Sequence, residues 1–407
     1  MANIDPLPSP VDDIEIPSSF SVSTISREIE CELKLVLTST PHIPALPVHP
    51  NAEIGRLFHN LIERAIKGSI DRSGSPQSDA KREFNRLLAA AEERLREKKQ
   101  TGRYADLSRT MSPLRWRRKR NRAVKAAARW LEKSSDQSNY PKEKHEHSVP
   151  RRSYRPSYRS LGDVGCWTEV NIYDEDLRLA GRMDLVEKKG DRVVIRDFKT
   201  GRVKNGEGEI LAHIRRQLQL YGLMVKRATP TSQVELIVEG QREYVIRFDH
   251  EIITQAEDWV RKLVSGLAKG KTVAATELAR PGVECTTCRY RHVCSAYLRS
   301  APHTWGKENS YRLPLDIGGT VKSVTEGYDS LIDIVLLDEA GRRVKIFALT
   351  REHAELVREN SDLWFFNLNI YRRSHNSDRW RHPLNFYEVS VDEPSNTAWT
   401  LRIYEND

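Results

Sequence analysis

The sequence has little apolar material. None of its apolar runs approaches the roughly 20 residues that a membrane-spanning helix needs, and its first residues lack the basic and then apolar pattern of a secretory signal. Hydrophobic residues make up 38% of the 407 residues, below the usual globular share, whereas charged residues make up 30%. We therefore expect no membrane partner, large polar surfaces, and enough length for two or three domains.

Cysteine is also scarce. The chain holds five cysteines, an odd number, and Cys285, Cys288 and Cys294 lie close together. This pattern argues against a secreted disulfide framework and predicts a reducing cytoplasm as the location. Three thiols at this spacing rarely occur without a metal. The fourth ligand must come from a distant position, where both Cys31 and Cys166 are available.

A complete nucleotide-phosphate loop is missing. The segment from Gly266 to Thr272 ends in Gly-Lys-Thr, but it has three residues between its glycines where the motif requires four. It also ends a predicted helix, whereas the loop should follow a strand. We find no ATP site, so any helicase motor must be a separate partner protein.

Positive charge is concentrated in one segment. Between Ser112 and Ser134, nine lysines and arginines stand against one acid, and Trp116 and Trp130 are interleaved with them. A packing face of Val124, Ala127, Ala128 and Leu131 is available on the same predicted helix. Dense charge of one sign predicts contact with the phosphate backbone of DNA, with a solvated helix surface as the alternative. Six of the basic residues recur at three- and four-residue steps and would form one stripe: Arg115, Arg118, Arg122, Lys125, Arg129 and Lys133.

Two carboxylates and an amine lie on what the pattern predicts to be adjacent strands. Asp184 ends the run Gly-Arg-Met-Asp, and Asp197 and Lys199 follow an apolar strand. Residues i and i+2 of a strand share a face, so Asp197 and Lys199 project together toward Asp184. Two acids can hold a divalent cation, and an ammonium group can bind a phosphate or orient a water. A solvated hairpin is the alternative, but unpaired charges are costly beside a buried strand.

These residues resemble the motifs of the PD-(D/E)xK nuclease superfamily, and specifically its RecB-like branch. In the family's order, the chain carries His59 on a predicted helix, the two acidic motifs, and the pair Gln217-x-x-x-Tyr221. Cys31 with the three clustered cysteines is similar to the iron–sulfur arrangement of AddB, exonuclease V and the CRISPR-associated RecB-like nucleases. The resemblance covers about residues 20–300.

The resemblance implies a metal-dependent deoxyribonuclease, expected to be an exonuclease, that acts on single-stranded DNA or DNA ends in repair, recombination or defence. It implies that Asp184, Asp197 and the backbone carbonyl of Phe198 bind Mg²⁺ or Mn²⁺. The imidazole of His59 would tilt the preference toward manganese. A catalytically weak DNA-binding scaffold that works beside a helicase is the alternative.

The resemblance also assigns supporting roles. Lys199 would hold the scissile phosphate and the attacking water, and Gln217 and Tyr221 would position Lys199 and the substrate. Glu169, on the preceding predicted strand, is a candidate for a further acid. The family pattern selects Cys31 as the fourth cysteine ligand and a 4Fe–4S cluster that staples the fold. A four-thiolate zinc site is the rival.

The implied fold is α/β, a restriction-endonuclease-like mixed sheet flanked by helices. We predict strands at 165–173, 177–187, 192–198, 233–239 and 243–248, and helices from about residue 23 through Val36, near Ile54 to Ala65, and at 80–98, 209–227 and 252–269. The predicted domains are a disordered leader (1–20), a nuclease domain (21–300) with a basic helical insertion (about 76–160) and the cysteine cluster (285–294), and a β-rich domain (302–407).

The last domain shows six short apolar or alternating runs with one helical stretch, 351–358, after the third. Strands in this order with one helix are typical of an OB-fold, a small barrel that often binds single strands. Another small β domain used for docking is the alternative. The predicted strands lie at 317–324, 329–337, 342–349, 363–371, 384–391 and 398–404.

Overall fold

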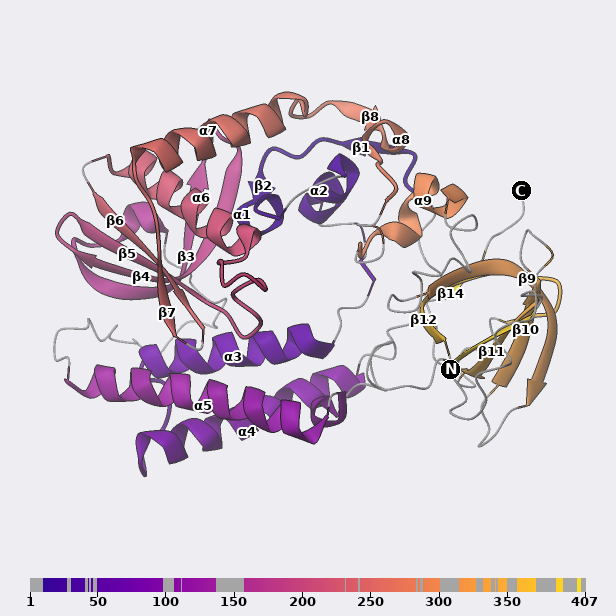
Figure 1. Ribbon diagram of the computed structural model, residues 1–407, viewed down its shortest axis with the longest axis horizontal. Helices are drawn as coiled ribbons and strands as arrows, with labels where there is room; N and C mark the ends of the chain where they lie inside the picture. The colour runs from indigo at the N-terminus through magenta and orange to yellow at the C-terminus, as the bar shows by residue number, and fades with distance from the viewer. Residues whose placement is uncertain are drawn as a thin grey trace, which may run out of the picture.

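The computed structural model describes most of the chain, and its elements form two parts (Figure 1). The larger part is a mixed sheet with helices on both faces, and the smaller is a β structure after residue 314. Among the described helices, none has the length and apolar character that crossing a membrane requires. The described residues are 10–27, 31–40, 43, 45–46, 50–97, 106–110, 112–136, 157–230, 232–240, 242–282, 285, 288–300, 315–326, 332–337, 341, 343–349, 357–370, 386–390 and 401–403.

An antiparallel meander of β3, β4 and β5 forms the centre of the main sheet. The helix α6 (Ala212–Ala228) then carries the chain to β6, which pairs with β5 in parallel, and β7 follows in the antiparallel direction. The sheet is therefore mixed, as the sequence predicts. Its strands are β2 (Phe20–Ser21), β3 (Val164–Asp174), β4 (Leu179–Lys189), β5 (Arg192–Phe198), β6 (Gln233–Glu239) and β7 (Glu243–Ile246).

Helices cover both faces of this sheet (Figure 1). Side chains alternate along a strand, so β5 sends Val193 and Ile195 to the layer that contains α6 and α7 (His250–Ser265), and Phe198 to the opposite layer. That opposite layer consists of α3 (Pro50–Ile66), α4 (Pro76–Glu97) and α5 (Pro113–Asp136). The packing face predicted for the basic helix α5 is buried, which confirms its orientation: Val124, Ala127, Ala128 and Leu131.

The predicted disordered leader is wrong for residues 10–20. The strand β1 (Asp13–Glu15) pairs with β8 (Thr272–Ala274), and Ile14, Ile16 and Phe20 are buried. The proline-rich composition suggested disorder, but the apolar residues find a partner strand at the far end of the domain. Residues 1–9 lie outside the described part of the chain.

The single helix predicted from about residue 23 through Val36 is also wrong. The structure has α1 (Val22–Ile25) and α2 (Glu32–Ser39), and residues 28–30 between them lie outside the described part. Cys31 precedes α2 with extended backbone angles, φ −131° and ψ 108°, instead of lying on a helix. The helical periodicity could not reveal this interruption, because both short helices bury apolar residues in the same core.

After β8 the described part of the chain includes the short helical elements α8 (Ala275–Leu278), η5 (Arg291–Val293) and α9 (Ser295–Ser300). Figure 1 shows α9 between the two parts. The second part then begins with the antiparallel meander of β9, β10 and β11. β13 pairs with β11 in parallel and with β12 in the antiparallel direction, and β12 returns to β9, so these strands close on themselves.

We call this closed structure the β barrel. β14 pairs with β12. The predicted helix at 351–358 lies outside the described residues except for its last two positions, which are not helical. The strands of the β barrel confirm the β-rich prediction: β9 (Leu315–Glu326), β10 (Ile332–Leu337), β11 (Arg343–Leu349), β12 (Asp362–Ile370), β13 (Phe386–Ser390) and β14 (Leu401–Ile403).

Candidate functional site

The two predicted acids lie side by side in the main sheet. Leu185 of β4 pairs with Arg196 of β5, so the next position along each strand places Asp184 beside Asp197. The backbone amide of Phe198 donates a hydrogen bond to Oδ2 of Asp184 over 2.8 Å, which joins the two strands at this point. The strand pairing predicted from the sequence therefore brings both carboxylates to one place.

Side chains from two helices complete this group. Nδ1 of His59, on α3, lies 3.4 Å from Oδ2 of Asp184. Nζ of Lys199 lies 2.8 Å from Oδ2 of Asp197 and donates to Oε1 of Gln217, on α6, over 3.2 Å. The structure thus brings together the histidine, both acids, the lysine and the glutamine that the sequence analysis selected.

Tyr221 lies one helical turn after Gln217 and is buried against β4. Its hydroxyl donates a hydrogen bond to the carbonyl of Arg182 over 2.8 Å. A Cβ atom at Gly181 would lie 2.5 Å from Cε1 of Tyr221, so only glycine allows the tyrosine ring to approach the strand this closely. The glycine of the Gly-Arg-Met-Asp run therefore serves the packing of α6 on the strand that carries Asp184.

Burial and neighbouring charges have opposite effects on the pKa values of the side chains at this site. Burial disfavours the ammonium form of Lys199, but Asp197 and Asp184 outweigh it and raise its pKa, so the lysine stays charged. Burial raises the pKa of Asp197. Burial also acts against the charged form of Asp184, but His59 and Lys199 hold its pKa below the ordinary value. Two adjacent acids, Asp197 buried and Asp184 half-buried, therefore favour any cation that can reach them.

Glu169 of β3 lies opposite Asp184 and belongs to the same group. Ligand atoms of His59, Glu169 and Asp184 all lie within 4.8 Å of one another, a spacing that suits a metal ion. The ladder between β3 and β4 pairs Thr168 and Val170 but omits Glu169, whose φ is +55°. That conformation costs on the order of 1 kcal/mol for a residue other than glycine. The sequence suggested Glu169 as a further acid, but no spacing rule predicts this local backbone.

The basic stripe of α5 reaches the loop that follows Lys199. Nη1 of Arg122 donates to the carbonyl of Thr200 over 3.1 Å, and Nη2 of Arg129 lies 3.2 Å from the buried Glu239 at the end of β6. The sequence analysis missed both contacts, because they join segments far apart in the chain. Other members of the stripe are exposed to solvent: Arg115, Arg118, Lys125 and Lys133.

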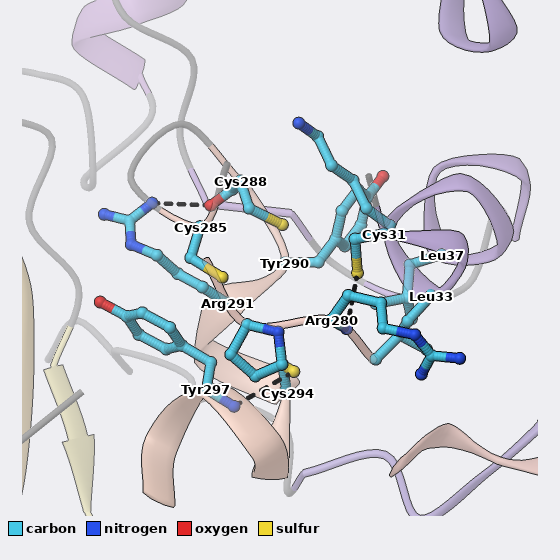
Figure 2. A pocket seen from close by; sticks show the side chains of 12 residues that line it. Cys31, Leu33, Leu37, Arg280, Cys285, Cys288, Tyr290, Arg291, Cys294 and Tyr297 are labelled. Atoms are coloured by element: carbon cyan, nitrogen blue, oxygen red, sulfur yellow. Dashed lines mark hydrogen bonds between the residues drawn. The ribbon is translucent and has the colours of Figure 1, made fainter. Parts of the chain in front are cut away.

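Four cysteines line one cavity between α2 and the loop before α9 (Figure 2). Cys285, Cys288 and Cys294 come from the loop, and Cys31 faces them from its position before α2. Cys166 lies elsewhere, on β3, where it packs against the layer of α3 and α5. The structure therefore brings Cys31, and not Cys166, to the clustered cysteines.

Backbone amides and burial act in opposite directions on the charge of these thiols. Backbone amides of Arg280 and Gly282 donate to the sulfurs of Cys31 and Cys285 over 3.5 and 3.4 Å. Hydrogen bonds of this kind stabilise negative charge on sulfur. Burial raises the pKa of Cys288 to about 11, so without a metal this thiol keeps its proton at neutral pH. A metal ion would have to displace that proton to bind.

The fold and the site together define a class of protein: a mixed sheet that presents a buried and a half-buried acid on adjacent strands, a lysine directly after the second strand, and a histidine supplied by a helix. The family model of the PD-(D/E)XK nuclease superfamily matches residues 19–295. This match spans more than half of the chain, and the chain belongs to that superfamily. Membership indicates a metal-dependent nuclease, and such nucleases generally use Mg²⁺ or Mn²⁺.

Among solved structures, the chain is similar to SSO0001, known from a crystal structure. The two share 19% identity over 32% of this chain and 61% of that one, with a TM-score of 0.21. The chain thus covers less than two thirds of that protein, and a likeness this weak says nothing about the fold. A comparison with curated proteins gave no match.

Replacing Glu169 should show whether it belongs to the metal site. We expect Glu169→Gln to weaken Mn²⁺ binding by roughly tenfold to a hundredfold, because the amide lacks the negative charge that attracts the cation. Isothermal titration with Mn²⁺ measures the change. Glu175→Gln, at an exposed position just after β3, is the matched control. Equal affinity in both variants would exclude Glu169 from the site.

Proposed function

We propose that the protein is a metal-dependent deoxyribonuclease of the RecB-like branch of its superfamily. The observation that carries this proposal is the group of Asp184, Asp197 and Lys199 on adjacent strands, with His59 3.4 Å from Asp184. Asp197 is buried with its Oδ2 2.8 Å from Nζ of Lys199, and ligand atoms of His59, Glu169 and Asp184 lie within 4.8 Å of one another. Carboxylate oxygens gathered in this way favour a cation, which supports a metal site here.

The residues present fit the metals that the superfamily uses. Asp184, Asp197 and the carbonyl of Phe198 would hold Mg²⁺ or Mn²⁺, with His59 and Glu169 as further ligands. When bound, the metal supplies a Lewis acid that lowers the pKa of a water and neutralises charge on the phosphate. Oxygen ligands suit both ions, and the imidazole of His59 favours manganese.

Lys199 is suited to hold the scissile phosphate and the attacking water. Its raised pKa keeps it as an ammonium group, so it acts by position and charge and does not remove a proton. Gln217 accepts a hydrogen bond from Nζ of Lys199, which fixes the direction of that ammonium group. Tyr221 supports the same arrangement by anchoring α6 to the backbone at Arg182.

Cleavage should depend on the acid and the lysine. With Mg²⁺ or Mn²⁺, we expect Asp197→Asn and Lys199→Ala to lower the rate of cleavage of end-labelled single-stranded DNA by at least about a hundredfold, because each removes charge that stabilises the transition state. Asp191→Asn changes an exposed acid in the turn before β5 and is the control. Full activity in both site variants would remove the assignment.

The same assay separates the nuclease from a DNA-binding scaffold. Tight DNA binding by the unmodified protein, with no turnover in either metal, would identify a scaffold that works beside a motor protein. Product lengths then distinguish the expected exonuclease from an endonuclease. A helicase partner stays a prediction from the lack of an ATP motif.

The α5 stripe is proposed to hold the DNA. Its exposed members continue along the helix from Arg122, which contacts the loop after Lys199, so a strand bound along α5 would lead toward the acids. The grip would be electrostatic and independent of sequence, because lysine and arginine on one helix face meet phosphates and not base edges.

Salt dependence of DNA binding tests this surface. Replacing Arg115, Arg118 and Lys125 with alanine should lower the slope of log affinity against log salt by roughly two to three units, at ~0.7–0.9 per phosphate contact. The charge-matched control replaces Lys81, Arg94 and Arg96, which are exposed on α4. An unchanged slope in the α5 variant would mean that this stripe is only a solvated surface.

The four cysteines are proposed to hold a 4Fe–4S cluster. A zinc ion with bonds of about 2.3 Å needs its four sulfurs about 3.8 Å apart. In the described part of the chain, no three of the cysteine sulfurs lie within 4.8 Å of one another, and the four cysteines border one pocket. The wide spacing of the sulfurs favours a group larger than one ion. A reducing cytoplasm suits such a cluster.

Metal analysis decides between iron and zinc. Protein purified without oxygen should contain about four irons per chain, as expected for a 4Fe–4S cluster, and absorb broadly in the visible range. Cys288→Ser should lose this iron and lower the thermal stability, because the cluster cross-links α2 to the loop before α9. Cys166→Ser is the matched control. Colourless protein with about one zinc per chain would establish the zinc alternative.

The β barrel is proposed to be OB-like. The order of its first five strands supports this assignment: an antiparallel meander of β9 to β11, β13 parallel to β11, and β12 returning to β9. Trp364 and Phe366 of β12 stack on each other, and they pack against Leu46 and Leu298 of the larger part. These two aromatic residues therefore serve docking, and bases would have to bind elsewhere on the barrel.

A further inference from the structure

The first strand of the β barrel is tied to the cysteine loop by a buried ion pair. Asp316 of β9 accepts two hydrogen bonds from the guanidinium of Arg291, in η5, one of them over 3.0 Å. The side chain of Asp316 is only 1% exposed and that of Arg291 only 4%. The hydroxyl of Tyr297, on α9, donates a third hydrogen bond to Asp316 over 2.6 Å. A carboxylate this deeply buried is stable only while its partners stay in place.

Arg291 and Tyr297, which hold Asp316, also donate hydrogen bonds to cysteines of the loop. Nη1 of Arg291 donates to the carbonyl of Cys288 over 2.7 Å, and the backbone amide of Tyr297 donates to Sγ of Cys294 over 3.4 Å. Figure 2 draws both contacts as dashed lines beside the pocket that the cysteines line. A shift of either cysteine therefore moves a group that holds Asp316.

Apolar contacts continue the same interface. Leu46 and Leu298 of the larger part pack against Trp364 and Phe366 of β12. The buried ring of His292, next to Arg291, meets the ring of Phe366 edge to face, with centroids 6.1 Å apart. Arg291 and His292 lie in η5, a 3-10 helix of three residues, which is too short to be stable by itself. Its position must come from its neighbours, and the cysteines flank it on both sides.

We infer that Arg291, Tyr297 and Asp316 couple the cysteine metal site to the docking of the β barrel. This inference rests on the proposed metal at the four cysteines. Thiolates bound to a common metal hold the loop, the loop holds Arg291 and Tyr297, and these two residues keep Asp316 paired. Loss of the metal releases the loop and weakens the hydrogen bonds that Asp316 accepts from Arg291 and Tyr297, so the barrel docks less firmly on the larger part.

If metal binding at the cysteines favours docking of the β barrel, docking must favour metal binding by the same factor. The docked barrel must therefore also help to retain the metal. A change in the barrel that does not touch any cysteine should then speed metal loss. This consequence distinguishes coupling from simple proximity. Asp316 therefore acts as a positioning residue for a metal site to which it contributes no ligand atom.

The test compares the full-length, metal-loaded protein with Asp316→Asn. We expect this variant to release metal on the order of ten times faster than the unmodified protein, measured with ferrozine for iron and pyridylazoresorcinol for zinc. Hydrogen exchange in β12 and α9 should rise in parallel. Asp333→Asn is the matched control, because it removes an acid of the barrel that pairs with Lys345, away from the interface. Equal release rates for Asp316→Asn and Asp333→Asn would overturn the coupling.

Tyr297→Phe is a second variant that keeps the buried ion pair and the amide of residue 297. It should release metal faster than the control but more slowly than Asp316→Asn, and release at the control rate would count against the coupling. Stripping the metal from the unmodified protein must also raise exchange in β12. If the purified protein carries metal but hydrogen exchange in β12 is unchanged after the metal is removed, the coupling is refuted and the metal site is not. Protein purified without iron or zinc refutes the metal site as well.

Discussion

The placement of two adjacent carboxylates, one buried and one half-buried, is the constraint on which the larger part of this structure depends. Asp184 and Asp197 repel each other and lose hydration where β4 and β5 meet, and that loss must be offset. The compensation comes from several elements at once: Lys199 after β5, His59 from α3, and the amide of Phe198. A helix packed on the sheet and the end of β5 are therefore both needed to complete one small charged site.

Neighbouring features support that arrangement. Gly181 lets Tyr221 approach β4, and Tyr221 anchors α6, which presents Gln217 to Lys199. On the opposite side, Arg122 links the basic helix to the loop after Lys199. The positive surface of α5 and the negative site in the sheet are thus held in a fixed relation. The proposed DNA substrate has a polyanionic backbone, so both surfaces would act on it together.

The cysteine site organises the other half of the molecule. Cys31 and the loop of Cys285 to Cys294 lie about 250 residues apart in the chain, near the two ends of the superfamily match. A cross-link over so long a loop would stabilise the fold by ~5 kcal/mol on a chain-entropy estimate. The same loop carries Arg291, which meets the first strand of the β barrel. One set of side chains therefore joins the N-terminal segment, the end of the larger part and the barrel.

By itself, the sequence determined the strands that carry the site, the helices α4 to α7, the candidate acids and lysine, and the superfamily, because local periodicity and motif spacing depend on neighbouring residues. It misjudged the segment 10–20, whose burial depends on the distant β8, and the region of Cys31, where a helical pattern hides a break. Only the tertiary structure decided that Cys31 and not Cys166 faces the cysteine loop, that Glu169 adopts φ +55° beside Asp184, and that Asp316 meets Arg291. These contacts join residues that are distant along the chain, and their energies depend on burial, which the folded chain alone creates.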